Sequence, residues 1–183
     1  MKRKKSAKNP RREVLIRNQW ITVWRERLKL PNGSTIPDYY FTKRPNMVIV
    51  VPLAENKKVV MLRQWRPVPK SYIYNLPMGL MDKKNESAMN AGRRELKEET
   101  GYSVKKLISL GVYWRAPAYL TSKVHIFLAL CETLPHRSFQ NKDRYELAVP
   151  KIMSLREAKQ RTTDLGSLAA LLLAEKFIKE HLI

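Results

Sequence analysis

Stretches of apolar residues predict a chain built mainly of strands, with helical patterns in its middle and at its end. Residues 47–53 form a continuous apolar run of the kind found in a buried strand, and residues 59–65 are predicted to be the next strand. A hairpin is expected upstream, because Pro31-Asn32-Gly33-Ser34 is a turn signal between two strand-like segments. The strands predicted elsewhere cover residues 20–30, 35–42, 72–76, 107–114, 124–131 and 147–153.

Helical periodicity is found in two segments. Within residues 86–100, Met89, Arg93, Leu96 and Thr100 recur at spacings of three and four, and Gly101 is well placed to end the helix. A short helix is predicted from Ser154. A final helix has its apolar positions at Leu168, Leu171, Leu172, Ala174 and Phe177, with Asp164 or Ser167 as its cap. The order of strands, helix, strands and helix predicts a mixed sheet between helices in a single α/β domain.

The charge of the chain changes this picture at its N-terminus. The 183 residues have a formal net charge of +20, and residues 1–12 contain seven basic and no acidic side chains. These twelve residues are predicted to form a disordered basic arm, with the folded domain over 13–183. Without the arm the charge is still +13. Nucleic-acid binding, attraction of an anionic small substrate and a general basic bias of the source proteome all remain open as explanations.

Cysteine content and hydropathy point to a cytoplasmic protein. The chain has one cysteine, Cys131, so no internal disulfide is available and a reducing compartment is expected. Its surroundings are typical of a buried strand position rather than of a catalytic thiol. The basic N-terminus lacks the apolar segment of a signal peptide, and the apolar stretch at residues 168–174 is too short to span a membrane.

Three glutamates carry the candidate chemistry. Glu95, Glu98 and Glu99 are three and four residues apart, so they project from one side of the predicted helix. Carboxylates crowded in this way repel one another unless a cation lies among them. Hard oxygen ligands suit Mg²⁺, with Mn²⁺ as the alternative, and such an ion can neutralise a diphosphate and activate water. The competing interpretation is a solvated helix whose acids pair with Arg93, Arg94 and Lys97.

The residues around these glutamates favour the metal interpretation. A glycine turn precedes the helix and Gly101 closes it. Glu86 lies eight residues before Arg94, about two helical turns away, so an ion pair between them is expected to brace the start of the helix.

The segment 79–102 resembles the Nudix signature, in which glycine, glutamate and Arg-Glu-apolar-any-Glu-Glu-any-Gly follow at set spacings. Arg94 to Tyr102 fits throughout, and seven residues separate Glu86 from Arg94. One departure is that six residues, rather than five, lie between Gly79 and Glu86. The resemblance implies a Nudix α/β/α sandwich with a mixed central sheet over residues 13–183.

Two further segments are similar to the ADP-ribose pyrophosphatase and ADP compounds hydrolase branch of that family. The first is Leu62-Arg-Gln-Trp-Arg66 followed by Asn75-Leu-Pro-Met-Gly-Leu-Met-Asp82, and the second is the proline loop at 115–123. The resemblance implies a pyrophosphohydrolase that cleaves ADP-ribose, NADH or diadenosine polyphosphates, and a homodimer that exchanges its N-terminal hairpin. An RNA 5′-pyrophosphohydrolase is the first alternative, motivated by the basic charge. A non-catalytic nucleotide sensor is the second.

Individual roles follow from the same resemblance. Glu95, Glu98 and Glu99 are expected to bind metal together with the backbone carbonyl of Met78, with Glu98 and Glu99 catalytic. Arg66 and Arg44 are the candidates for holding the diphosphate or the terminal ribose. A late acidic residue would activate water; Glu146 is the best positional match and Asp143 the second choice. The aromatic residues considered for adenine stacking are Trp20, Tyr39, Tyr40 and Trp65, for which core packing is the alternative.

Overall fold

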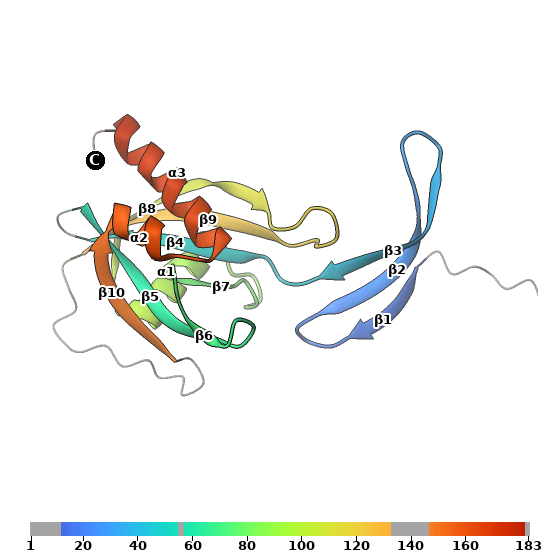
Figure 1. The fold of residues 1–183 in the computed structure, drawn as a ribbon, viewed down its shortest axis with the longest axis horizontal. Coiled ribbons are helices and arrows are strands. Elements are labelled where there is room, and N and C mark those ends of the chain that lie inside the picture. The colour runs from blue at the N-terminus through green and yellow to red at the C-terminus, as the bar shows by residue number, and fades with distance from the viewer. Residues whose placement is uncertain (1–11, 55–56, 133–146, 182–183) are drawn as a thin grey trace, which may run out of the picture. The chain divides into compact units, whose positions relative to one another are not determined.

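The chain forms two compact units in a computed structural model that describes residues 12–54, 57–132 and 147–181 (Figure 1). One unit comprises residues up to Pro45 together with Trp114–Ser122, and the other comprises Asn46–Tyr113 and the residues from Lys123 onwards. No helix of the described residues is long and apolar enough to cross a membrane. The elements are β1 (Glu13–Arg17), β2 (Thr22–Lys29), β3 (Thr35–Lys43), β4 (Met47–Leu53), β5 (Lys58–Arg66), β6 (Ser71–Asn75), β7 (Met78–Leu80), α1 (Ala88–Thr100), β8 (Val104–Trp114), β9 (Lys123–Cys131), β10 (Ala148–Ser154), α2 (Leu155–Arg161) and α3 (Leu165–His181).

The first unit is an antiparallel sheet in the order β1-β2-β3. The predicted hairpin forms β2 and β3, and Gly33 in its turn has a φ of +87°, a conformation that glycine adopts without strain. Trp24 and Phe41 are cross-strand partners whose rings stack with centroids 5.2 Å apart. Arg12, the last residue of the predicted arm, places its guanidinium 3.7 Å from the centre of the Trp24 ring. The rest of that arm lies outside the described residues.

The second unit contains the predicted mixed sheet. Its strands run β10-β5-β4-β9-β8, with β6 paired to β5 and β7 paired to β4. The β4–β9 pair is parallel, whereas β10–β5, β5–β6 and β4–β7 are antiparallel. Every residue of β4 is buried, as its continuous apolar sequence predicts for a strand covered on both faces.

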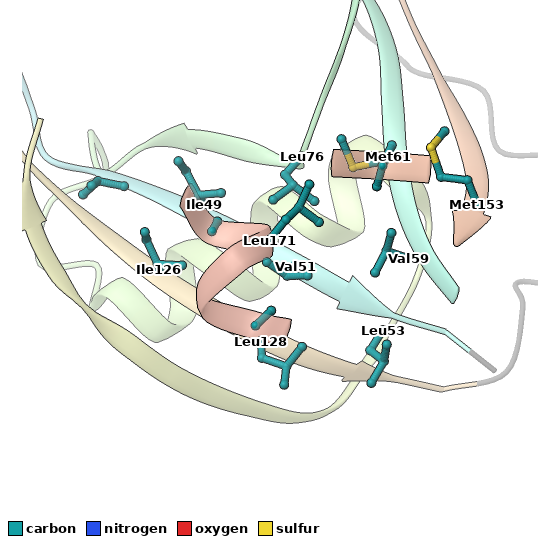
Figure 2. Packing of buried hydrophobic residues seen from close by; sticks show 14 of the residues in the cluster. Ile49, Val51, Leu53, Val59, Met61, Leu76, Ile126, Leu128, Met153 and Leu171 are labelled. Carbon is teal, nitrogen blue, oxygen red and sulfur yellow. The ribbon is translucent and has the colours of Figure 1, made fainter. Parts of the chain in front are cut away.

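Alternation along β4 divides the core between two helical layers. Ile49 and Val51 belong to a cluster that includes Leu171 of α3, and Figure 2 shows these side chains together. Val48 and Val50 point to the other face, in a cluster that includes Leu96 of α1. The sheet is therefore covered by α1 on one face and by α3 on the other, as the predicted α/β/α sandwich requires.

Three local predictions were incomplete. The strands β1 and β7 were not anticipated, because Glu13–Arg17 follows a strongly basic segment and Met78–Leu80 has only three residues. Helix α1 begins at Ala88 rather than at Glu86, with the Ser87 side chain accepting a hydrogen bond from the Asn90 backbone N–H. Met89 is not on the buried face of this helix but is 46% exposed.

Candidate active site

The backbone of strand β7 supports the candidate site. Its residues pair with β4, with Met78 opposite Ile49 and Gly79 opposite Val48. The connection from β6 is also fixed, because the Pro77 carbonyl accepts a hydrogen bond from the Val50 N–H at 2.9 Å. On the α3 side, the buried Ser167 hydroxyl accepts a hydrogen bond from the Leu76 N–H at 2.9 Å. The backbone leading into β7 is therefore held by both β4 and α3.

Helix α1 brings the predicted acids to this strand. Ser87 caps its N-terminus, and Gly101 ends it in the left-handed conformation with a φ of +76°. Between these caps, Ala91 and Leu96 anchor the helix in the core, so the turn that carries Glu95 and Glu99 faces β7.

Glu99 joins the helix directly to the strand. Its side chain is buried, with 6% of the residue exposed, and its Oε2 accepts a hydrogen bond from the Met78 backbone N–H at 2.9 Å. A buried carboxylate needs such partners to offset its lost hydration. Met78, whose carbonyl is predicted to bind a metal, thus contacts the predicted metal ligand Glu99 through its backbone N–H.

Glu95 occupies the space above Gly79. A Cβ atom added to Gly79 would lie 2.0 Å from the Glu95 Cδ and 2.1 Å from its Oε1. The requirement for glycine here is therefore one of clearance, because any side chain at residue 79 would occupy the space of this carboxylate. The side chain of Glu95 is 13% exposed.

A single arginine ties the remaining acids together. Arg94 binds Glu86 with both its Nε and its Nη2, at 2.8 and 2.9 Å, and its Nη1 contacts Glu95 at 2.6 Å and Glu98 at 3.0 Å. Its Nη2 also donates to the Leu80 carbonyl at 3.3 Å. The predicted Glu86–Arg94 pair is confirmed, although Glu86 precedes the helix instead of lying two turns up its face.

Because Arg94 contacts several carboxylates at once, its charge dominates the electrostatics of this cluster. The hydrogen bond from Arg94 lowers the pKa of Glu86, and the same contact raises the pKa of Arg94. One positive charge is divided among three carboxylates, so Arg94 alone does not neutralise them. Lys83 adds a more distant contact, with its Nζ 3.9 Å from the Glu98 Oε1.

The donor set fits a hard divalent cation. Carboxylate oxygens from one helical turn and the adjacent backbone of β7 are the ligand types that Mg²⁺ and Mn²⁺ prefer. With the side chains as they stand, no three His, Cys, Asp or Glu residues of the described chain already converge as a metal site. The contacts with Arg94 explain the positions of Glu95 and Glu98, and the 54% exposed Glu98 side chain has room to turn.

The other predicted site residues occupy different places. Arg66 ends β5 on the strand face of Val60, which belongs to the same core cluster as α1. Arg44 is exposed and belongs to the first unit. Glu146 and Asp143 lie outside the described residues.

The aromatic residues considered for adenine stacking differ in their exposure. Trp20 and Tyr40 are exposed, at 54% and 51%, whereas Tyr39 packs against Phe41 and donates a hydrogen bond to the Ala118 carbonyl. Trp65 is 39% exposed and alternates with Arg66, so it lies on the opposite face of β5.

Two structural roles at the site were not anticipated from the sequence. The clearance at Gly79 and the hydrogen bond of Ser167 to Leu76 both join residues that are distant along the chain. The glycine between Met78 and Leu80 was a visible signal for close backbone approach, but it does not identify the side chain that approaches.

Comparison with known proteins gives consistent matches. Residues 42–172 match the NUDIX domain family model. Over 118 residues the chain is 32% identical to an ADP-ribose pyrophosphatase of Bacillus subtilis, covering 64% of this chain and 63% of that protein. It is also 32% identical over 120 residues to the ADP compounds hydrolase NudE of Escherichia coli, covering 64% and 62% of the two chains. The match thus spans less than two thirds of either relative.

A solved structure extends the similarity to nearly the whole chain. The crystal structure of an ADP compounds hydrolase superposes with a TM-score of 0.78 at 25% sequence identity. The match covers 93% of this chain and 92% of that one, so the likeness includes more of the chain than the NUDIX domain match.

Proposed function

Because the chain belongs to the Nudix family, we propose that it is a divalent-metal-dependent pyrophosphohydrolase acting on ADP-linked compounds. The substrates we propose are ADP-ribose, NADH and diadenosine polyphosphates, which would give AMP and a phosphorylated remainder. The observation that carries this proposal is the placement of Glu95 and Glu99 against β7. The two relatives, an ADP-ribose pyrophosphatase and an ADP compounds hydrolase, supply the substrate class.

In the proposed site, Glu95, Glu98 and Glu99 hold the metal, with the Met78 carbonyl as a further ligand. We propose Mg²⁺, with Mn²⁺ as the alternative. A bound ion of this kind neutralises phosphate oxygens and lowers the pKa of bound water. Glu99 is kept in position by the Met78 N–H, and Arg94 keeps Glu95 and Glu98 on the same side of the helix. Glu98 and Glu99 would be the catalytic members of this set.

Two arginines and one late acid complete the proposed mechanism. Arg66 would hold the diphosphate, since a planar guanidinium binds phosphate oxygens in pairs, and Arg44 would hold the diphosphate or the terminal ribose. Glu146 is proposed to take the proton from water, with Asp143 as the second candidate. Comparing kcat of Glu146→Gln with that of Asp143→Asn distinguishes them, because loss of the residue that removes the proton from water should lower kcat by about 100-fold or more, whereas loss of a plain loop charge should change it little.

The test of the function is a substrate panel assayed with Mg²⁺ and with Mn²⁺. We expect AMP to be released from ADP-ribose in the presence of either ion and not in the presence of a chelator. A protein that binds ADP-ribose tightly and leaves it intact with Mg²⁺ present would be a nucleotide sensor, and the proposed hydrolysis would be wrong.

A second candidate substrate is the 5′ triphosphate end of RNA, favoured by the net charge of +20. Pyrophosphate release from 5′-triphosphate RNA and AMP release from ADP-ribose can be compared in one experiment. A higher kcat/KM for the RNA would replace the ADP-linked assignment with this one.

The proposed assembly is a homodimer in a reducing, cytoplasmic setting, with the β2–β3 hairpin as the exchanged element. Light scattering coupled to size-exclusion chromatography tests the first part. A mass of one chain, about 21.5 kDa, would exclude the dimer.

A further inference from the structure

A second set of aromatic and cationic side chains gathers on the sheet formed by β6, β5 and β10. Trp65 of β5 is the direct cross-strand partner of Tyr72 in β6, and Arg63 is partnered by Tyr74 in β6 and Val149 in β10. Cross-strand partners point to the same side of a sheet, so these five residues share one face. We call this face the ring face; the three strands that carry it are adjacent in Figure 1.

The ring face is exposed to solvent, and two guanidinium groups, those of Arg63 and Arg161, lie over its tyrosine rings. Trp65 is 39% exposed, Tyr72 45% and Val149 50%. The Arg63 guanidinium lies 4.2 Å from the centre of the Tyr72 ring. At the end of α2, Arg161 lies 5.5 Å from the centre of the Tyr74 ring and donates to the Tyr74 hydroxyl at 3.3 Å.

The ring face lies on the opposite side of β5 from α1 and its acidic turn. Trp65 and Arg63 continue the side of β5 that carries Val59 and Met61, which pack with α2 and α3 residues. The alternate side of β5 carries Val60, which packs with α1 residues. The ring face is therefore a separate surface, and the proposed hydrolysis gives it no role.

Charge identifies the kind of partner that fits. The three strands contain no carboxylate, and the charged strand residues on the ring face are Arg63 and Lys151, the latter being the cross-strand partner of Met61. Among the described residues, the one acid ion-paired with a cation of the ring face is Glu157, which contacts Arg161 at 2.9 Å. A second copy of this chain would bring another +20 of charge to a basic surface, so self-association through this face is disfavoured.

We propose that the ring face binds single-stranded nucleic acid, in an interaction beyond the proposed hydrolysis. Neighbouring bases would stack on Trp65 and Tyr72, and Arg63 and Arg161 would contact the flanking phosphates. Exposed rings beside guanidinium groups are the combination that binds single strands with little sequence preference, because every base has a face that can stack.

The experiment measures binding of a fluorescently labelled, unstructured 12-nucleotide RNA to the full-length protein by anisotropy, at about 0.15 M salt because binding of this kind depends on salt. Trp65→Ala and Tyr72→Ala should each raise Kd by about 5-fold or more, since one base stack is lost in each. Trp65→Leu keeps apolar bulk without the ring and should give the same loss, which guards against misfolding of the alanine variant. Residues 1–12 are retained in every variant, so their contribution cancels.

Matched controls come from exposed residues elsewhere on the chain. Tyr119→Ala removes a ring that is 54% exposed, and Lys106→Ala removes the same charge as Arg63→Ala. Both controls should leave Kd within about 2-fold, whereas Arg63→Ala should weaken binding and reduce its salt dependence.

Three results would overturn the proposal. The first is an unchanged Kd in all three ring variants. The second is displacement of the RNA by ADP-ribose at the concentration that saturates hydrolysis, which would locate binding at the acidic site. The third is a loss of oligomeric mass in Trp65→Leu, which would make the ring face an interface between copies of the chain. None of these results bears on whether ADP-ribose is hydrolysed.

Discussion

The Glu95 carboxylate and the Gly79 backbone occupy adjoining space so closely that a Cβ on Gly79 would lie 2.0 Å from the Glu95 Cδ. This separation is far below any van der Waals contact. Glu95 is also bound by Arg94 at 2.6 Å, so displacing the carboxylate would disturb that contact as well. The acidic turn of α1 and the short strand β7 are thus matched to each other at a single pair of residues.

The first prediction tests that match with Gly79→Ala. We expect kcat to fall by about 100-fold or more, because the added methyl group displaces Glu95 and a misplaced ligand loses the geometry that the reaction needs. Unfolding should remain cooperative. Turnover with ADP-ribose and thermal unfolding are the measurements.

The control for this variant is Gly92→Ala, in the middle of α1. A Cβ there would meet its nearest neighbours, Phe127 and Val50, at an ordinary 3.4 Å. Removing a glycine from a helix interior stabilises it by up to about 1 kcal/mol. Turnover should be unchanged, and comparable losses in both variants would refute the special role of residue 79.

The second prediction concerns Glu99→Gln. The amide oxygen of glutamine can still accept the Met78 N–H, so the fold should persist, but the negative charge offered to a metal is lost. We expect turnover to fall by about 100-fold or more and Mn²⁺ affinity, measured by calorimetry, to fall with it. Glu180→Gln, on the exposed end of α3, is the charge-matched control. A near-normal rate in Glu99→Gln would refute the metal assignment.

Most of the framework was predictable from the sequence because buried strands and amphipathic helices have distinct periods. The apolar run in β4 identified a strand covered on both faces, and the spacing of Glu95, Glu98 and Glu99 placed them on one side of α1. Strand β7 was missed since three residues are too few to show a period, and its order comes from pairing with β4.

The finer structure of the site depends on contacts between distant parts of the chain. Ser167 was considered only as a cap for the last helix, yet its hydroxyl accepts the Leu76 N–H from a position 91 residues away. The other predicted cap, Asp164, is confirmed, because it accepts the Ser167 N–H at 2.7 Å. A sequence shows which groups can form hydrogen bonds, whereas the packing of α3 against β4 and against Leu76, between β6 and β7, decides which of them meet.

The third prediction concerns Cys131 at the end of β9. Burial raises the pKa of its thiol to about 12, so the reactive thiolate is scarce at neutral pH. We expect modification by a thiol-specific reagent at pH 7.5 to be slow in the folded protein and fast in denaturant. Cys131→Ala should retain the turnover of the unaltered chain. Rapid modification accompanied by loss of activity would instead indicate a functional thiol.

The last prediction concerns the ion pair between α2 and α3. The Lys159 Nζ lies 2.6 Å from the Glu175 Oε2, and this hydrogen bond lowers the pKa of Glu175 below its ordinary value of 4.5. A carboxylate with a lowered pKa in the folded state stabilises the fold above the unfolded pKa, and this stabilisation is lost as the pH falls through the folded value.

Glu175→Gln should therefore lower the free energy of unfolding at pH 7 by about 0.2–1 kcal/mol, the range measured for surface ion pairs. The difference from the unaltered chain should shrink as the pH is lowered from 4.5 through the folded pKa of Glu175, where both proteins lack the charge. Urea unfolding at pH 7 and at several acidic values measures it. Glu180→Gln breaks an exposed pair with Lys176 at 3.8 Å and should change stability little at any pH. If the difference for Glu175→Gln stays constant with pH, the effect comes from packing, because a contribution from the charge of Glu175 would disappear once its carboxylate is protonated.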